Sequence, residues 1–255
     1  MPICEEMPLY MKNHIKINYL YNSGFYVETE KHILVFDYYL DSVPSGNKNK
    51  TKGTIGLEDL NVDKPFFVFA THSHFDHFNP VIFQWRNQVK NINYILSDDI
   101  RTSETGKNIN FIAPDKKLNI DGVEIFTFGS TDLGVSFLVK VDNVTIFHSG
   151  DLNWWDWFDE SHAYNLKMEK DFKKEILKVK NFSIDLAFFP VDSRLKDSFY
   201  LGGEYFINEI SPKYFIPMHF GENYEITKKF LQKIPSASTG IIEITHRGQE
   251  FNLKL

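Results

Sequence analysis

Short apolar runs separated by polar breaks fill the first part of the chain. Three of them are rich in β-branched and aromatic residues with turn-forming residues between, which predicts antiparallel strands at residues 15–21, 24–29 and 32–39. Residues 65–71 are a continuous apolar run of strand length, which indicates a strand that is buried on both faces. Residues 79–90 then predict a helix, with Asn79 as N-cap and Pro80 at its first position.

The remainder alternates strands with helices. We expect five strands at residues 93–96, 108–113, 123–128, 134–141 and 144–148. Apolar side chains recur at helical spacing within residues 161–180, which predicts the longest helix. Further strands are expected at 184–191 and 214–218, helices at 200–210 and 225–233, and a closing hairpin of 241–246 and 250–255. This order predicts an α+β fold of two packed sheets with helices outside, in one domain over residues 1–255.

Composition and charge bear on the compartment and the partners. The 255 residues carry 28 Lys and Arg against 34 Asp and Glu, and a net charge of −6 argues against a nucleic-acid-binding surface. Cys4 is the only cysteine, which fits a reducing compartment. The N-terminus carries Glu5 and Glu6 where an export signal needs basic and apolar residues, and no run approaches the roughly 20 apolar residues of a membrane span. We therefore expect a cytoplasmic protein with a small-molecule substrate and neither a nucleic-acid nor a membrane partner, in an oligomeric state left open.

The sharpest chemical signal is the segment T-H-S-H-F-D-H at residues 71–77, directly after an apolar run. His72 and His74 are two residues apart on extended chain, so their side chains leave on the same side. Asp76 and His77 can join them only through a turn, which the start of the next predicted helix supplies. Imidazole nitrogens and a carboxylate are ligands that suit zinc, and also iron or manganese. The segment therefore predicts a metal site.

This segment resembles the H-x-H-x-D-H motif of the metallo-β-lactamase superfamily. In that family a later Asp, often in a G-D pair after a strand, bridges two metals, and Asp151 in F-H-S-G-D stands there. The last His ligand of the family is matched by His219 in P-M-H-F-G, and an early Asp that supports the ligands by Asp37 in L-V-F-D-Y. The resemblance implies a four-layer αββα sandwich that holds one or two divalent transition-metal ions, zinc before manganese or iron. It assigns the ligands to His72, His74, Asp76, His77, Asp151 and His219.

The sequence departs from the family pattern at one ligand. The family usually places another His between His77 and Asp151, but residues 128–134 read F-G-S-T-D-L-G. Asp132 is a candidate to replace it with an oxygen, and water is the alternative. His148 is the other candidate, although on its strand we expect it to pack or hydrogen-bond beside the site. Two divalent ions with two carboxylates and a hydroxide sum to about +1, which favours anionic substrates, and to about zero if Asp132 also ligates.

Two further features are candidates for substrate binding. Trp154 and Trp155 follow Asp151 closely and could form a wall beside the metals, with packing under the next helix as the equal alternative. Arg194 follows a buried strand and could bind a substrate anion or pair with Asp192.

The resemblance implies a metal-dependent hydrolase. A metal-bound hydroxide would cleave a small, anionic ester, lactone or phosphodiester, and Asp76 would be the catalytic residue that orients or deprotonates the water. The chain length and the G-D form at Asp151 are similar to the lactonase- and phosphodiesterase-like cytoplasmic branches. Two alternatives stay open: an iron-dependent redox enzyme for persulfide or oxygen chemistry, and a non-catalytic metal-binding regulatory protein.

Overall fold

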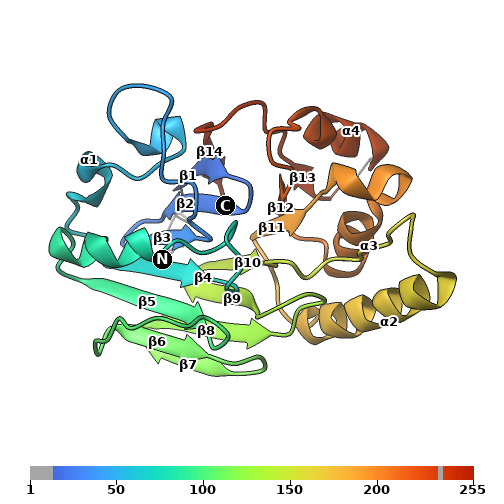
Figure 1. Cartoon of the computed structure of the whole chain (residues 1–255), viewed down its shortest axis with the longest axis horizontal. Helices are drawn as coiled ribbons and strands as arrows, with labels where there is room; N and C mark the ends of the chain where they lie inside the picture. Colours follow the sequence, from blue (N-terminus) through green and yellow to red (C-terminus); the bar gives the residue numbers. More distant parts are fainter. Residues whose placement is uncertain (1–13, 235–237) are drawn as a thin grey trace, which may run out of the picture.

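Two seven-stranded sheets lie face to face in the computed structural model, which describes residues 14–234 and 238–255 (Figure 1). The first sheet runs in the order β14 (Glu250–Lys254), β1 (His14–Tyr21), β2 (Gly24–Glu28), β3 (Ile33–Phe36), β4 (Phe66–Ala70), β5 (Ile92–Ser97) and β6 (Ile109–Ile112). The second runs in the order β13 (Gly240–Ile241), β12 (Tyr214–Met218), β11 (Leu186–Pro190), β10 (Val144–His148), β9 (Ser136–Val141), β8 (Val123–Phe128) and β7 (Lys117–Ile120). Cys4, Glu5 and Glu6, used above to predict the compartment, lie outside the described residues.

Helices cover the outer face of each sheet. The helix α1 (Leu57–Leu60) and the 3-10 helix η2 (Pro80–Asn87) bury apolar side chains on the first sheet. The helices α2 (His162–Val179), α3 (Leu201–Ile210) and α4 (Glu225–Lys233) lie together over the second sheet (Figure 1). Two short 3-10 segments, η1 (Lys50–Lys52) and η3 (Ser193–Ser198), lie in loops. The layer order of helix, sheet, sheet and helix confirms the predicted αββα sandwich.

Aromatic side chains fill the space between the sheets. The rings of Phe25 on β2 and Phe188 on β11 stack with centroids 4.1 Å apart, and both side chains are fully buried. On β4, Phe67 and Phe69 point into this inter-sheet core, whereas Phe66 packs under the helical layer on the other face. Successive residues of a strand face opposite sides, so a strand covered on both sides must be apolar throughout. This explains the continuous apolar run at β4.

Two predicted elements differ from the structure. The closing hairpin is wrong, because β13 pairs in parallel with β12 in the second sheet, whereas β14 pairs antiparallel with β1 in the first. The helix expected at 79–90 is the 3-10 helix η2, although Asn79 does cap it by accepting a hydrogen bond from the Val81 N–H at 2.9 Å. A 3-10 helix aligns residues three apart, and here Ile82 and Trp85 are both buried against the sheet.

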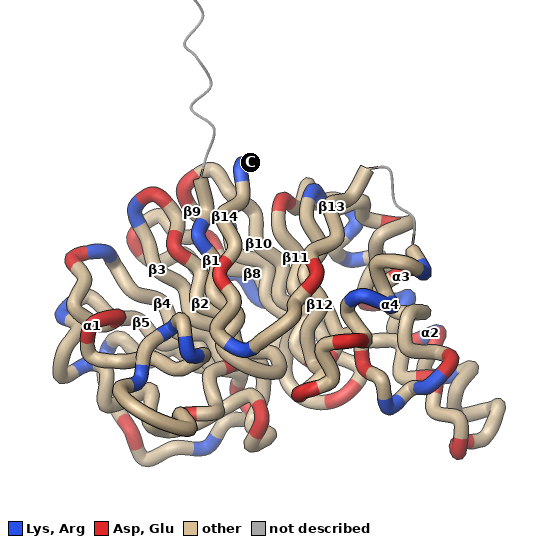
Figure 2. The backbone as a smooth tube through the Cα atoms, turned by 90° about the horizontal axis from the view of Figure 1, so that it is seen from above, with Lys and Arg blue, Asp and Glu red and all other residues tan. Residues whose placement is uncertain are grey.

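Charged residues are distributed along loops and helices of both halves, with acidic and basic positions interspersed (Figure 2). Among the described residues, no helix has the length and apolar character needed to cross a bilayer.

Candidate metal centre

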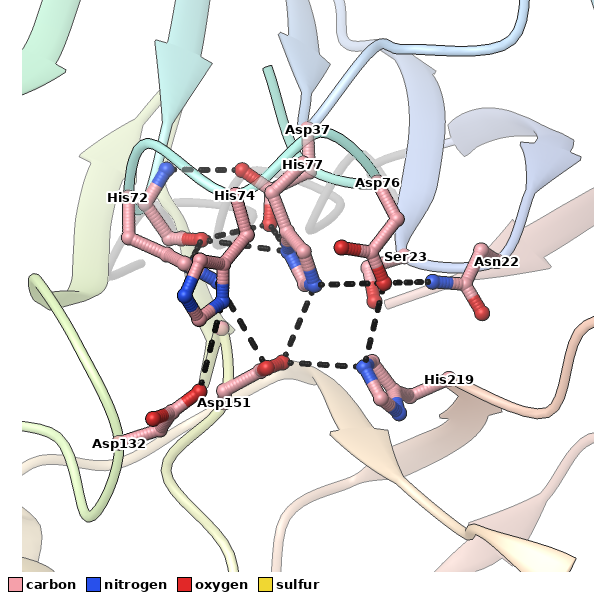
Figure 3. Close-up of polar contacts among 12 residues, drawn as sticks. Asn22, Ser23, Asp37, His72, His74, Asp76, His77, Asp132, Asp151 and His219 are labelled. Atoms are coloured by element: carbon pink, nitrogen blue, oxygen red, sulfur yellow. Dashed lines mark hydrogen bonds and ion pairs between the residues drawn. The ribbon is translucent and has the colours of Figure 1, made fainter. Parts of the chain in front are cut away.

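The ends of several strands bring the candidate ligands to one edge of the two sheets. The strands β3 and β4 are parallel in the first sheet, and β10, β11 and β12 are parallel in the second, so within each sheet their carboxyl ends meet at one edge. Asp37 follows β3, residues 71–77 follow β4, Asp151 follows β10 and His219 follows β12. Figure 3 shows these side chains pointing toward a common centre.

Four side chains form the first ligand group: His72, His74, Asp132 and Asp151, whose ligand atoms all lie within 4.8 Å of one another. The Nε2 atom of His72 lies 3.1 Å from His74 Nδ1 and 3.6 Å from Asp151 Oδ2. Asp132 Oδ2 lies 3.5 Å from His74 Nδ1. The loop at 128–134 therefore brings a carboxylate to the place where the family pattern has a His.

Asp76, His77 and His219 form the second ligand group. Asp76 Oδ2 lies 3.7 Å from the Nε2 atom of each histidine. Asp151 stands between the two groups: its Oδ1 atom is 3.2 Å from His77 Nε2 and 3.4 Å from His219 Nε2. Its other oxygen, Oδ2, faces His72 in the first group. A single carboxylate thus adjoins both groups.

The centre contains two buried polar atoms that make no hydrogen bond within the described structure, His77 Nε2 and Asp151 Oδ1. Leaving such atoms without a partner in a dry interior is costly. A cation shared between them would remove this cost, because imidazole nitrogen and carboxylate oxygen are both ligands of divalent transition metals. The residues present therefore fit the metal ions that the fold implies.

Asp37 helps to position the candidate ligands through hydrogen bonds to Thr71 and His77. It is fully buried and accepts three hydrogen bonds, from the Thr71 N–H at 2.8 Å, the Thr71 hydroxyl at 2.7 Å and His77 Nδ1 at 2.7 Å. Because Nδ1 of His77 is used in this way, its Nε2 atom is directed to the centre. Asp37 also anchors the start of the segment that carries four candidate ligands.

Asp192 holds His219 in the same manner, and the sequence analysis did not assign it that role. His219 Nδ1 lies 3.0 Å from Asp192 Oδ2, so a donated hydrogen bond directs Nε2 to the second group. Arg194 donates hydrogen bonds to the same oxygen, Asp192 Oδ2, from Nε at 2.9 Å and from Nη2 at 2.6 Å. Arg194 therefore makes the pair with Asp192 that was one of its two predicted roles. The only signal in the sequence was the position of Asp192 after a buried strand.

Asn22, in the turn between β1 and β2, is a second residue that the sequence analysis missed. Its side-chain amide donates to Asp76 Oδ2 at 3.2 Å, and its Oδ1 accepts from the Gly221 N–H at 3.2 Å. Its backbone carbonyl accepts from the His219 N–H at 3.1 Å. In the sequence it stood out only as part of a turn signal.

His148 belongs to neither ligand group. Its Nε2 donates to the Ser23 carbonyl at 2.9 Å, and its Nδ1 accepts from the Gly150 N–H at 3.2 Å. Its ring stacks on Phe36 with centroids 5.1 Å apart. Both ring nitrogens are thus used within the protein, so of the two side chains considered for the missing ligand, Asp132 is the one that lies in a ligand group.

The surroundings set the charges of the first group. Burial lowers the pKa of His72 to about 4, so its ring is neutral at pH 7 and has a lone pair for a metal. Burial opposes ionisation of Asp151, but the nearby His219 and His77 outweigh it and hold the pKa of that carboxyl well below its usual range. Burial and the proximity of Asp151 raise the pKa of Asp132.

In the second group, neighbouring carboxylates raise the pKa values of both histidines. Burial opposes protonation of His77, but Asp151 and Asp37 together raise its pKa well above the ordinary value. The pKa of His219 is likewise raised, against burial, by Asp151 and Asp192. In the metal-free protein the neighbouring carboxylates favour the protonated form of both imidazoles, and a divalent ion that binds an imidazole nitrogen would displace its proton.

A cavity of about 450 Å³ opens beside the centre. Its polar lining includes Asp132, Asp151 and His219, and Trp155 and Arg194 also line it. Trp155 is held by a hydrogen bond from its Nε1 to the Asp151 carbonyl at 2.9 Å. A larger cavity of about 810 Å³ near α1 and η2 includes no member of either ligand group.

Of the two roles predicted for Trp154, the structure shows the packing one. Its ring packs against Phe172 of α2, with centroids 6.2 Å apart, and it is absent from the cavity lining. The ammonium of Lys173 lies 4.5 Å from its ring centroid. Trp154 therefore joins α2 to the loop after β10, which was the alternative role.

Comparison with known proteins agrees with this picture. No family model matches the chain. The chain is 21% identical over 261 residues to the UPF0173 metal-dependent hydrolase of Staphylococcus aureus strain RF122, covering 92% of this chain and 98% of that protein. It is 22% identical, at the same coverage, to the corresponding protein of strain N315. Both relatives are named metal-dependent hydrolases, the class of protein that the resemblance predicted.

Solved structures show the same architecture. The metallo hydrolase Igni18 from Ignicoccus hospitalis superposes with a TM-score of 0.65 at 15% identity, covering 95% of this chain and 99% of that one. The metallo-β-lactamase fold protein YhfI from Bacillus subtilis gives 0.57 at 14% identity, covering 94% and 100%. The diiron β-hydroxylase CmlA from Streptomyces venezuelae gives 0.61 at 9% identity, covering 98% of this chain and 55% of that one. The chain has the metallo-β-lactamase fold, which confirms the fold that the resemblance implied.

Proposed function

We propose that this protein is a metal-dependent hydrolase that cleaves a small ester, lactone or phosphodiester. The observation that carries the proposal is the convergence of four His and three Asp side chains in two adjoining groups, with Asp151 between them. A centre that only stabilised the fold would be closed, whereas this one lies beside an open cavity. The relatives named metal-dependent hydrolases support the same class.

The side chains present would hold two ions. His72, His74, Asp132 and Asp151 would hold the first, and Asp76, His77, Asp151 and His219 the second. Zinc suits both sets, and the carboxylate of Asp132 also makes the first set suitable for manganese or iron. When bound, such ions would supply an activated water and polarise an oxygen of the scissile group.

Asp76 is the proposed catalytic residue of the chain itself. Its side chain is 25% exposed and lines the cavity, and Asn22 holds its Oδ2 atom. The other oxygen, Oδ1, is then free to accept a proton from an attacking water in the cavity. Proton acceptance at Oδ1 and ligation at Oδ2 would use the two oxygens of one carboxylate for different tasks.

The charge of the centre with its ions bound bears on the predicted preference for an anionic substrate. With Asp132 as a ligand, two divalent ions are balanced by three carboxylates and a deprotonated water, so the sum is about zero rather than about +1. Net charge at the metals then gives no preference for an anionic substrate. Arg194 remains as a positive group in the cavity lining, and it is the residue through which an anion would be recognised.

An iron-dependent redox enzyme is the second candidate function. Two observations favour it: the oxygen ligand from Asp132 in the first group, and the similarity of the fold to a diiron β-hydroxylase.

A small-molecule substrate and a cytoplasmic location remain predictions from the sequence.

A substrate panel distinguishes these functions. Protein purified without added metal would be loaded with Zn, Mn or Fe and assayed with a bis-aryl phosphodiester, an acyl lactone, a thioester and a cephalosporin. Oxygen uptake with a persulfide would be measured in parallel. The proposal predicts hydrolysis of at least one substrate that a chelator abolishes and that Asp76→Asn lowers by several orders of magnitude. Oxygen uptake with iron and no hydrolysis would support the redox enzyme instead. Bound metal without either activity would favour a non-catalytic protein.

A further inference from the structure

Large apolar side chains are exposed at the mouth of the cavity beside the metal centre. Phe75 is 81% exposed and Tyr164 is 41% exposed, and both line the cavity. Leu133 and Phe158 are also exposed and stand next in sequence to lining residues. Single apolar residues on a surface are ordinary, but a group of them around a cavity marks a binding site.

The inner wall of this cavity is also aromatic. Trp155 and Trp157 stack with centroids 5.8 Å apart and an angle of 5° between their planes. The guanidinium of Arg194 lies 5.7 Å from the Trp157 ring centroid on the cavity lining. Trp155 is in turn tied to the backbone of Asp151. The apolar wall is therefore attached directly to the residue that stands between the two ligand groups.

The rest of the apolar lining comes from other parts of the chain. Phe75 lies within the segment of candidate ligands, between His74 and Asp76, and its ring meets Tyr39 edge to face at 6.2 Å. Tyr164 and Met168 line the cavity from the first turns of α2. A molecule in the cavity would thus contact apolar side chains from several segments while its reacting atoms face Asp151.

We propose that the site selects substrates carrying a bulky apolar acyl or aryl group next to the scissile bond. This inference rests on the proposed hydrolysis and specifies its substrate class. The apolar group would lie against Phe75, Tyr164, Trp157 and Met168, and the scissile group would face Asp151 and His219. Apolar contact rather than charge would provide most of the selectivity, because the loaded centre is close to neutral and Arg194 is paired with Asp192.

The first test is a series of acyl esters with one leaving group and acyl chains of increasing length. Burial of one methylene contributes about 0.8 kcal/mol, which corresponds to a gain of up to about fourfold in kcat/KM per methylene. Phe75→Ser and Tyr164→Ser are expected to flatten this dependence. Leu177→Ser is the matched control, because Leu177 is also exposed, at 53%, on the same helix α2 as Tyr164, but does not line the cavity. All three positions are exposed, so the variants are expected to fold, and urea unfolding would verify this.

The second test measures binding without turnover. Calorimetry would compare acetate, phenylacetate and naphthylacetate on the zinc-loaded protein and on the same three variants. We expect affinity to increase with the size of the aryl group in the wild type and in Leu177→Ser, and not in Phe75→Ser or Tyr164→Ser.

The two tests separate the inference from the proposed function. Hydrolysis that is independent of acyl length, with phenylacetate bound no more tightly than acetate, would contradict the apolar site and leave the hydrolase standing. Size-dependent binding without hydrolysis of any ester, lactone or phosphodiester would support the apolar site and contradict the proposed reaction. Equal length dependence in wild type and both rim variants would also overturn the inference.

Discussion

Asn22 donates its side-chain amide to Asp76 at 3.2 Å, although 54 residues separate the two in sequence. The backbone carbonyl of the same asparagine accepts a hydrogen bond from the His219 N–H. The turn between β1 and β2 therefore fastens a ligand from the first sheet to a ligand from the second. The positions of both depend on a residue that is itself in neither ligand group.

The first prediction concerns this contact. Asn22→Ala removes the donor to Asp76, and loss of such a supporting hydrogen bond typically costs 10- to 100-fold in metal affinity or activity. We expect zinc affinity of the second group to fall by about that factor in calorimetric titration of metal-free protein. Asn110→Ala is the control, because the side-chain amide of Asn110 donates to the Tyr94 carbonyl on β5 and belongs to neither ligand group. Identical zinc titrations of Asn22→Ala and wild type would refute the positioning role.

The second prediction concerns Asp192. Asp192→Asn removes the charge that holds His219 and pairs with Arg194, so the imidazole is free to turn away from the second group. Zinc affinity should fall by about 10- to 100-fold. Asp185→Asn serves as the control, because Asp185 is also a carboxylate near β11 but accepts its hydrogen bond from the Thr145 N–H. An unchanged zinc affinity in Asp192→Asn would show that the hydrogen bond has no part in metal binding.

The third prediction uses two glycines in the left-handed region. Gly134 has φ +71°, and a Cβ there would lie 2.1 Å from the Thr71 carbonyl oxygen and 2.6 Å from His72 Cβ. Gly122 has φ +88° with nothing within 4 Å of the added carbon. Gly122→Ala should therefore cost only the backbone strain, about 1–2 kcal/mol. Gly134→Ala should cost more and also weaken metal binding, because its added carbon displaces His72.

Urea unfolding and zinc titration of both variants check this comparison. Equal losses of stability with zinc binding intact in both would mean that the approach of Gly134 to the ligand segment is unimportant.

Residue spacing alone predicts only the local part of the site, whereas the distant Asp37, Asp151 and His219 were assigned through the family resemblance. His72, His74, Asp76 and His77 are contiguous and follow a recognisable buried strand, so their convergence needs only a turn. Asp132 reaches the first group through the loop between β8 and β9, far along the chain. Its place there depends on how the two sheets pack, which no periodic pattern encodes. For the same reason Asn22 and Asp192 were found only in the structure.

The wrong hairpin has a similar origin. The two segments of the predicted hairpin flank Arg247 and Gly248, which form a local turn signal, and the turn is present, since Gly248 has φ +80°. The pairing of the flanking residues is decided elsewhere: β12 offers a parallel edge to β13, and β1 offers an antiparallel edge to β14. Choice of partner strand is a tertiary property, so the signal located the turn and misassigned the strands.

The fourth prediction is a pH dependence of stability away from the metal centre. Burial opposes ionisation of Asp142, but hydrogen bonds from Thr29, His32 and the Lys31 N–H outweigh it and lower its pKa below the ordinary 3.8. A group with a lowered pKa stabilises the folded protein above its ordinary value and loses that contribution as the pH falls through the folded one.

Asp142→Asn should therefore lower the free energy of unfolding by about 1 kcal/mol at pH 7, and by progressively less below pH 4. Urea unfolding across this range measures the difference from wild type. Asp121→Asn, at an exposed turn with φ +50°, is the control and should match wild type throughout. A difference for Asp142→Asn that persists unchanged at pH 3 would contradict the assignment.

Asp151 adjoins both candidate ion sites, and the number of zinc ions bound per chain tests this arrangement most directly. Metal-free wild type, Asp151→Ala and Asp185→Asn would be equilibrated at the same free zinc concentration and analysed by mass spectrometry for ions per chain. We predict that wild type and Asp185→Asn take up two equivalents and that Asp151→Ala takes up fewer than one, because both groups lose a ligand. Two equivalents in Asp151→Ala, or none in the wild type, would contradict the account.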